Sequence, residues 1–193
     1  VLVSDKPPGP ELDLARASVV RWADYAAQLS EGFEYDPKGG VVVATDDAGR
    51  APLADLVARH RDVGMTAELV DGAGLRTLEP HLAGDLELGA HYPDDAQVQP
   101  VLASSALLAD SRRLGAVVHG HCDVLGFEHD RDGHVAAVRT TQGTVTAGAV
   151  VNAAGPWSTA VARLAGSDLP VRPRRGHLLV TVPVAPLVHH KVY

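Results

Sequence analysis

Apolar residues recur at spacings of three and four between residues 10 and 29, and this pattern predicts an amphipathic helix. The proline- and glycine-rich run 6–10 before it is typical of a turn. The same spacing predicts two more helices, over about 51–63 and 100–114, each followed by a glycine. A short turn of helix is expected at about 75–82.

Short runs of aliphatic and β-branched residues between the helices predict strands. The pair Gly39-Gly40 introduces one of them, and alternation from Leu86 to Tyr92 places every second side chain on one face. The other predicted strands lie at about 1–3, 41–45, 65–70, 116–119, 149–152 and 192–193.

The segment from Val124 to Ala147 predicts a β-meander of three short strands. Its two connections, 130–133 and 141–143, each contain the glycine that tight hairpins need. The meander leads into the predicted strand 149–152. The order helix, strand, meander and strand is typical of the second half of a dinucleotide-binding fold, in which parallel strands are joined by a crossover.

A corner of small residues, Ala153-Ala154-Gly155, ends that strand, and a helix is expected to begin at Pro156. Such small side chains allow a ligand to lie close to the backbone. The N–H groups at the start of a helix can also bind an anion such as a pyrophosphate. A corner that is packed tightly for its own sake is the alternative interpretation.

Composition restricts the class of protein. Of the 193 residues, 46% are hydrophobic and 21% charged, which is typical of a globular protein. The net charge of -7 argues against a nucleic-acid partner or an anionic membrane surface. The most apolar run, 177–188, contains two prolines and is too short to span a bilayer.

Cysteine and histidine do not form a metal motif in this sequence. The single cysteine, Cys122, excludes an internal disulfide and fits a reducing compartment, so we expect a cytoplasmic protein. In the run 119–123, a strand would point Cys122 away from the two neighbouring histidines. The adjacent pair His189-His190 also lacks the spacing of a helical metal site, and no metal is expected.

Three features together resemble a known family. Residues 150–158, Val-Val-Asn-Ala-Ala-Gly-Pro-Trp-Ser, are similar to a strand that ends in Ala-Gly-x-Trp-Ser. Residues 169–180 are similar to a Pro-x-x-Pro-x-Arg-Gly-Gln strand, with His177 in place of the frequent glutamine. The order of 115–124, 138–143 and the first run also fits. The chain thus resembles the D-amino acid oxidase-like FAD-dependent oxidoreductases, such as glycine oxidase and sarcosine oxidases.

Residues 1–12 are in addition similar to the flavin subunits of opine, hydroxyproline and proline-type dehydrogenases. The resemblance implies cofactor-binding roles for five residues. Val124 matches a valine whose backbone N–H and C=O meet the adenine of FAD. Ala153, Ala154 and Gly155 match residues packed on its adenosine and pyrophosphate. Trp157 matches a residue at the start of the next helix, where packing of that helix onto the sheet is the alternative role.

The resemblance leaves the catalytic residues unknown and suggests two substrate contacts. Tyr92 lies on a predicted strand of the substrate domain, where an ordinary tyrosine at a sheet edge is the alternative. His177 lies on a strand that leaves the FAD domain, where a hydrogen-bonded histidine between domains is the alternative. None of the arginines at 172, 174 and 175 is assigned to a substrate carboxylate.

The activity implied by the resemblance is oxidation of the C–N bond of an amino acid or secondary amine, by hydride transfer to FAD. Small-molecule substrates resembling glycine, sarcosine, an opine or hydroxyproline are expected. The nearest alternative is an FAD-dependent 2-hydroxy acid or glycerol-phosphate oxidoreductase. A non-catalytic binding or assembly module that keeps the fold is an alternative of a different class, and both homo- and hetero-oligomers are compatible with the family.

We therefore predict a mixed α/β chain that contains part of a Rossmann-like FAD-binding domain and part of an antiparallel-sheet substrate domain. Residues 1–99 and 166–193 are assigned to the substrate lobe, and residues 100–165 to the second half of the FAD-binding domain. No Gly-x-Gly-x-x-Gly follows a predicted strand. Both ends lie in strand-like runs, so we expect a fragment that by itself binds FAD weakly and is inactive.

Overall fold

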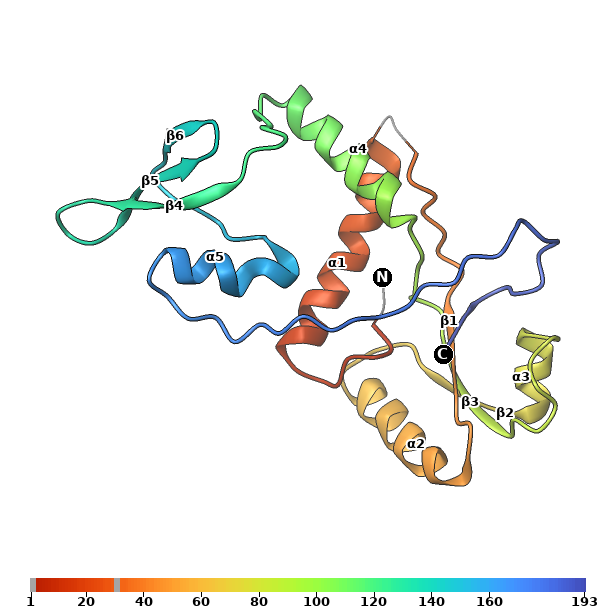
Figure 1. The fold of residues 1–193 in the computed structure, drawn as a ribbon. Coiled ribbons are helices and arrows are strands. Elements are labelled where there is room, and N and C mark those ends of the chain that lie inside the picture. The colour runs from red at the N-terminus through yellow and green to blue at the C-terminus, as the bar shows by residue number, and fades with distance from the viewer. Residues whose placement is uncertain (1–2, 30–31) are drawn as a thin grey trace. The chain divides into compact units, whose positions relative to one another are not determined.

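The computed structural model describes residues 3–29 and 32–193. The chain divides into two compact units (Figure 1): unit 1 comprises Val1–Ala116 with Pro183–Tyr193, and unit 2 comprises Val117–Val182. This division rests on contacts within the chain and does not identify functional lobes. The lobes expected at 1–99, 100–165 and 166–193 therefore stay a prediction. Among the described residues, no helix combines the length and the apolar character that crossing a membrane requires.

A four-stranded sheet forms the centre of unit 1. Its strand order is β2-β3-β1-β7, in which β3 pairs antiparallel with both β1 and β2. The last strand pairs parallel with β1, with Lys191 opposite Gly40. The strands are β1 Gly40–Val43, β2 Glu68–Asp71, β3 Leu88–Tyr92 and β7 Lys191–Val192. These four strands confirm the strands predicted at about 41–45, 65–70, 86–92 and 192–193.

Four helices accompany this sheet: α1 Pro10–Gln28, α2 Asp47–Asp62, α3 Gly72–Leu78 and α4 Pro100–Arg113. Helix α2 begins four residues earlier than predicted because the Asp46 carboxylate accepts the Gly49 N–H at 2.8 Å and caps it. Asp71 caps α3 in the same way at 2.8 Å. Prolines at the first position of α1 and α4 lose no helical hydrogen bond there.

Two apolar clusters fill unit 1. The larger one joins the sheet to α1 and α2 through Leu12, Leu53, Val57, Ala90 and Tyr92, together with other buried residues. In the smaller one, Phe33 packs against two alanines of α4, with Trp22 of α1 beside it. The apolar stripe predicted for residues 10–29 therefore has the packing partners that an amphipathic helix requires.

A buried carboxylate ties distant parts of unit 1 together. Asp95 is 0% exposed and accepts the Val3 N–H at 2.8 Å and the Ser4 hydroxyl at 2.6 Å. The Tyr193 hydroxyl also donates to it. A Cβ on Gly40 would lie 2.5 Å from Asp95 Oδ2, so only glycine fits beside this carboxylate. The beginning of β1 thus lies against both described ends of the chain.

Unit 2 contains a three-stranded antiparallel meander in the order β4-β5-β6, followed by a short helical segment (Figure 1). The meander predicted from residues 124–147 is confirmed. Gly133 and Gly143 have φ angles of 85° and 121°, as the hairpin connections require. The elements are β4 Val124–His129, β5 Val135–Thr140, β6 Gly143–Thr146, the 3₁₀ helix η1 Gly155–Trp157 and α5 Ser158–Leu164.

Three predicted strands do not form. Residues 116–119, 149–152 and 169–180 have no strand pairing in the described part of the chain. A strand is stable only when its backbone groups find a partner, and these segments run exposed instead, with Leu179 93% accessible. For the strand predicted at 1–3, residues 1 and 2 lie outside the described residues, while Val3 and Ser4 belong to a bend and a turn.

We predict that Asp95→Ala lowers the free energy of unfolding of unit 1 by about 3 kcal/mol, because it leaves several buried donors without an acceptor. The neighbouring Asp94 is exposed, so Asp94→Ala provides a matched control, with a change within about 0.5 kcal/mol. Urea denaturation followed by Trp22 fluorescence in a Trp157→Phe background reports unit 1. Equal effects of the two substitutions would contradict the role given to Asp95.

Candidate cofactor-binding site

The corner at residues 152–158 is held by the side chain of Asn152. Its amide Nδ2 donates to the Ser158 carbonyl at 2.9 Å, and its Oδ1 accepts the Ala154 N–H at 3.2 Å. The chain turns at Gly155, which has a φ of 54°. Asn152 belongs to the run 150–158 but is not among the predicted site residues. Asparagine before a turn is nevertheless a known signal for this kind of bond.

The N–H groups of this corner are largely used within it. Besides Ala154, the Trp157 N–H donates to the Ala154 carbonyl at 3.0 Å, and the Ser158 N–H donates to the Gly155 carbonyl. Pro156 has no N–H to offer. Local bonds thus use the N–H groups of Ala154, Trp157 and Ser158, which leaves fewer of them for an anion than expected, and the anion contact stays a prediction.

The same corner is open to contact with a flat or apolar group. A Cβ built on Gly155 would meet nothing within 4 Å, so there is free space beside the backbone. The Trp157 side chain is 71% exposed, so this side chain does not itself pack α5 onto the sheet. Ala153 is exposed as well. This arrangement suits van der Waals contact with a nucleoside better than binding of a phosphate.

Val124 presents its backbone at an open sheet edge. β4 is an edge strand of the meander, and Val124 lies opposite Thr140. Just before this pair, the Thr141 N–H donates to the Asp123 carbonyl at 3.0 Å. Because hydrogen-bonded and non-hydrogen-bonded pairs alternate along an antiparallel ladder, the N–H and C=O of Val124 face away from β5. An extended backbone thus offers one donor and one acceptor outward.

Both features lie within unit 2. Helix α5, which follows the corner, packs against β4, whose first residue is Val124. The Thr159 hydroxyl on α5 lies 2.7 Å from the carbonyls of both Leu169 and Val171, which holds the next stretch of chain on this helix. The cofactor-binding roles of Val124, Ala153, Ala154, Gly155 and Trp157 stay predictions, and their accessibility fits a bound nucleoside.

Neither predicted substrate contact is supported by its position. His177 is exposed in a segment without regular structure, so the strand expected to carry it is absent. Tyr92 is 0% exposed in the larger apolar cluster of unit 1. Its hydroxyl lies 3.0 Å from His60 Nδ1, while His60 Nε2 lies 2.7 Å from the Lys6 carbonyl.

The hydrogen-bond roles in this buried pair follow from the carbonyl. Because the Lys6 carbonyl can only accept, Nε2 of His60 carries a proton, and in the neutral imidazole Nδ1 then accepts from the Tyr92 hydroxyl. Burial, and then the negative charge of Asp95, raise the pKa of Tyr92 to about 12. The tyrosine therefore holds β3 to α2 as a neutral donor.

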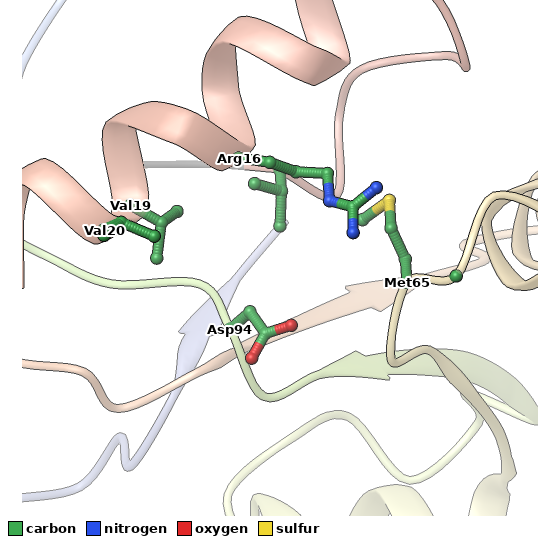
Figure 2. A pocket seen from close by; sticks show the side chains of 7 residues that line it. Arg16, Val19, Val20, Met65 and Asp94 are labelled. Carbon is green, nitrogen blue, oxygen red and sulfur yellow. The ribbon is translucent and has the colours of Figure 1, made fainter.

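A cavity of about 250 Å³ lies in unit 1, beside α1. Figure 2 shows the side chains of Arg16 and Met65 and the carboxylate of Asp94 among the residues that line it. One Arg16 nitrogen donates to the Val63 carbonyl at 3.1 Å, which fixes part of this wall. None of the residues predicted to bind the cofactor lines this cavity. Its lining is Val3, Arg16, Val19, Val20, Gly64, Met65 and Asp94.

One group of metal-ligand types occurs among the described residues, at the β4–β5 connection: Asp130, Asp132 and His134. All three side chains are exposed, and Asp130 Oδ1 accepts the N–H groups of the other two at 2.9 Å. This bonding accounts for the group as a hairpin turn. The run 119–123, expected as a strand, instead turns at His121, whose φ is 54°.

The meander, the corner and the four-stranded mixed sheet fit the fold class of a flavin-dependent oxidoreductase. A family profile described as FAD dependent oxidoreductase matches residues 2–192, and the chain belongs to this family. The curated relatives include glycine oxidase of Geobacillus kaustophilus, which is 30% identical over 95% of this chain and 50% of its own. Human mitochondrial sarcosine dehydrogenase is 29% identical over 69% of this chain and 15% of its own.

Solved structures agree with this assignment. The crystal structure of Geobacillus kaustophilus glycine oxidase superposes with a TM-score of 0.87 and 25% identity, covering 99% of this chain and 53% of that one. The chain therefore spans about half the length of this relative. The fold class predicted from the sequence is confirmed, as is the family.

We predict that unit 1 loses stability as the pH rises from about 10 to 12, because Tyr92 must stay neutral when folded. The stabilisation that goes with this raised pKa is fully present below about pH 10 and is lost as the pH rises. Each unit by which the pKa of Tyr92 differs between the folded and the unfolded chain corresponds to about 1.4 kcal/mol. Urea denaturation at pH 8.5–11.5 should show a shallower loss in Tyr92→Phe than in wild type. An unchanged slope in Tyr92→Phe, or the same change in the surface control Tyr25→Phe, would argue against this linkage.

Proposed function

We propose that the chain forms the adenosine-side wall of the FAD site of an enzyme that oxidises the C–N bond of an amino acid or secondary amine. Its membership of the FAD dependent oxidoreductase family supports the cofactor. Similarity to glycine oxidase and sarcosine dehydrogenase supports the substrate class. Bound FAD would supply the hydride acceptor for this oxidation.

The observation that carries the proposal is the outward-facing backbone of Val124 on β4, the strand against which the helix after the corner 152–158 packs. A donor and an acceptor on one extended residue match the edge of an adenine ring, which needs no particular side chain. The small residues Ala153 and Gly155 would let the adenosine lie against the backbone, and Trp157 would offer an exposed aromatic face. The Asn152 bonds keep this corner in place.

The Val124 contact is tested by Val124→Pro in protein expressed from the complete open reading frame. Proline removes only the outward N–H and no ladder bond, as is tolerated on an edge strand. We expect the Kd for FAD to rise roughly tenfold, since a lost hydrogen bond is worth about 1 to 1.5 kcal/mol. Fluorescence quenching of free FAD on titration with the apoprotein measures it.

Val124→Thr serves as the matched control because it changes the side chain and keeps the N–H. We expect this variant to bind FAD within about twofold of wild type. Equal affinities for Val124→Pro and wild type would contradict the backbone contact. A loss that is the same in both variants would assign the effect to the side chain instead.

The substrate class is tested by flavin bleaching under anaerobic conditions with the same full-length protein. We expect glycine, sarcosine, proline or an opine to reduce the flavin at least tenfold faster than lactate or glycerol 3-phosphate does. The opposite order would favour the hydroxy-acid or glycerol-phosphate alternative. Flavin that is bound but bleached by none of them would favour a non-catalytic module.

A further inference from the structure

A second buried carboxylate, Glu79, lies just after α3 and holds the last residues of the chain. It is 2% exposed, and its Oε1 accepts the His189 N–H at 2.8 Å and also the His190 N–H. The ring Nδ1 of His190 lies 2.9 Å from the same oxygen. Three donors from two adjacent residues thus converge on one carboxylate oxygen. We call residues His189–Tyr193 the strap.

The strap is held against β1 and β3 by a close pair of imidazoles. The rings of His190 and of His91 on β3 meet edge to face, with their centroids 5.2 Å apart. A Cβ on Gly39 would lie 3.3 Å from the His190 ring and 3.4 Å from the His91 ring, and Gly39 also has a φ of 76°. The glycine therefore leaves the space in which the two rings meet.

The charges around this pair can compensate one proton better than two. From the strap, His190 faces this region, and from the end of α3, Glu79, whereas the Lys191 ammonium donates to the Ala96 carbonyl at 3.1 Å. β2 contributes Glu68, which lies opposite His91 in register, while β1 has no titratable side chain. Glu79 pairs directly with His190 and not with His91, so a proton on His91 would have no carboxylate bonded to it among the described residues.

We propose that Glu79, His91 and His190 form a proton-sensitive latch, which holds the strap on the sheet of unit 1 near neutral pH and loosens it on acidification. The strap follows directly after the segment that returns to unit 1 at Pro183. This inference concerns unit 1 alone and does not depend on the proposed activity.

The direction of the pH effect follows from His91. Burial, and then the charge of His190, lower its pKa below the usual 6.5, while Glu68 acts in the opposite direction. When the strap leaves, both lowering influences weaken and the pKa of His91 rises. Docking is therefore favoured fully above about pH 6.5 and is weakened as the pH falls below it.

The test is amide hydrogen exchange of residues 190–193 between pH 7.5 and 5.0, corrected for the intrinsic exchange rate. We expect the opening constant to rise roughly tenfold for each unit by which the pKa of His91 differs between docked and undocked strap. The opening constants of the β2 and β3 amides should not change with pH in this way. His91→Gln should remove the pH dependence, whereas His134→Gln, in the exposed β4–β5 hairpin, should keep it.

Two outcomes would overturn the latch: a flat wild-type profile, or an undiminished pH dependence in His91→Gln. Equal opening of the whole of unit 1 would also overturn it, since that would indicate global unfolding. Should His91→Gln fail to fold, NMR titration of the wild-type imidazoles decides. A His91 midpoint below 6.5 that moves upward in His190→Gln supports the latch, and a midpoint at or above 6.5 rejects it.

Discussion

The buried carboxylate of Asp95 is the interaction on which unit 1 depends most. It joins a loop after β3 to residues 3–4 and to Tyr193, three places far apart in the sequence. Glu79 does the same for His189 and His190. Burying a carboxylate without hydrogen-bond donors costs a large free energy, so Asp95 and Glu79 must both keep their donors. Because these donors come from distant parts of the sequence, the chain folds back around both carboxylates. The pair Gly39-Gly40 leaves room for one cluster on each side.

Unit 2 is governed by a different constraint, the pairing of strand edges. The meander satisfies itself internally, whereas the segments at 116–119, 149–152 and 169–180 find no strand partner in the described chain. The same rule leaves the outer backbone of β4 open at Val124. The open edge at Val124 and the accessible corner at 152–158 are the proposed ligand contacts of this unit, and the family assignment makes FAD the proposed ligand.

Local signals in the sequence predicted much of this fold. The helices at 10–28 and 100–113 follow from periodicity and prolines, and the meander follows from two turn glycines. Periodicity says nothing of pairing, so the three unpaired strands were overpredicted. The roles of Asp95, Glu79 and His60 were missed, because Asp94 and Asp95 look equivalent until burial separates them. Tyr92 likewise resembled a substrate contact and proved to be part of the core.

We propose that the open edge at Val124 and the corner at 152–158 form one wall of an FAD site. Hydrogen exchange with mass spectrometry on the complete protein, with and without FAD, tests this wall most directly. We expect FAD to slow exchange at residues 123–125 and 153–158 together, while exchange at the β5–β6 connection is unchanged. Protection elsewhere in unit 2 with none at these two segments would contradict it.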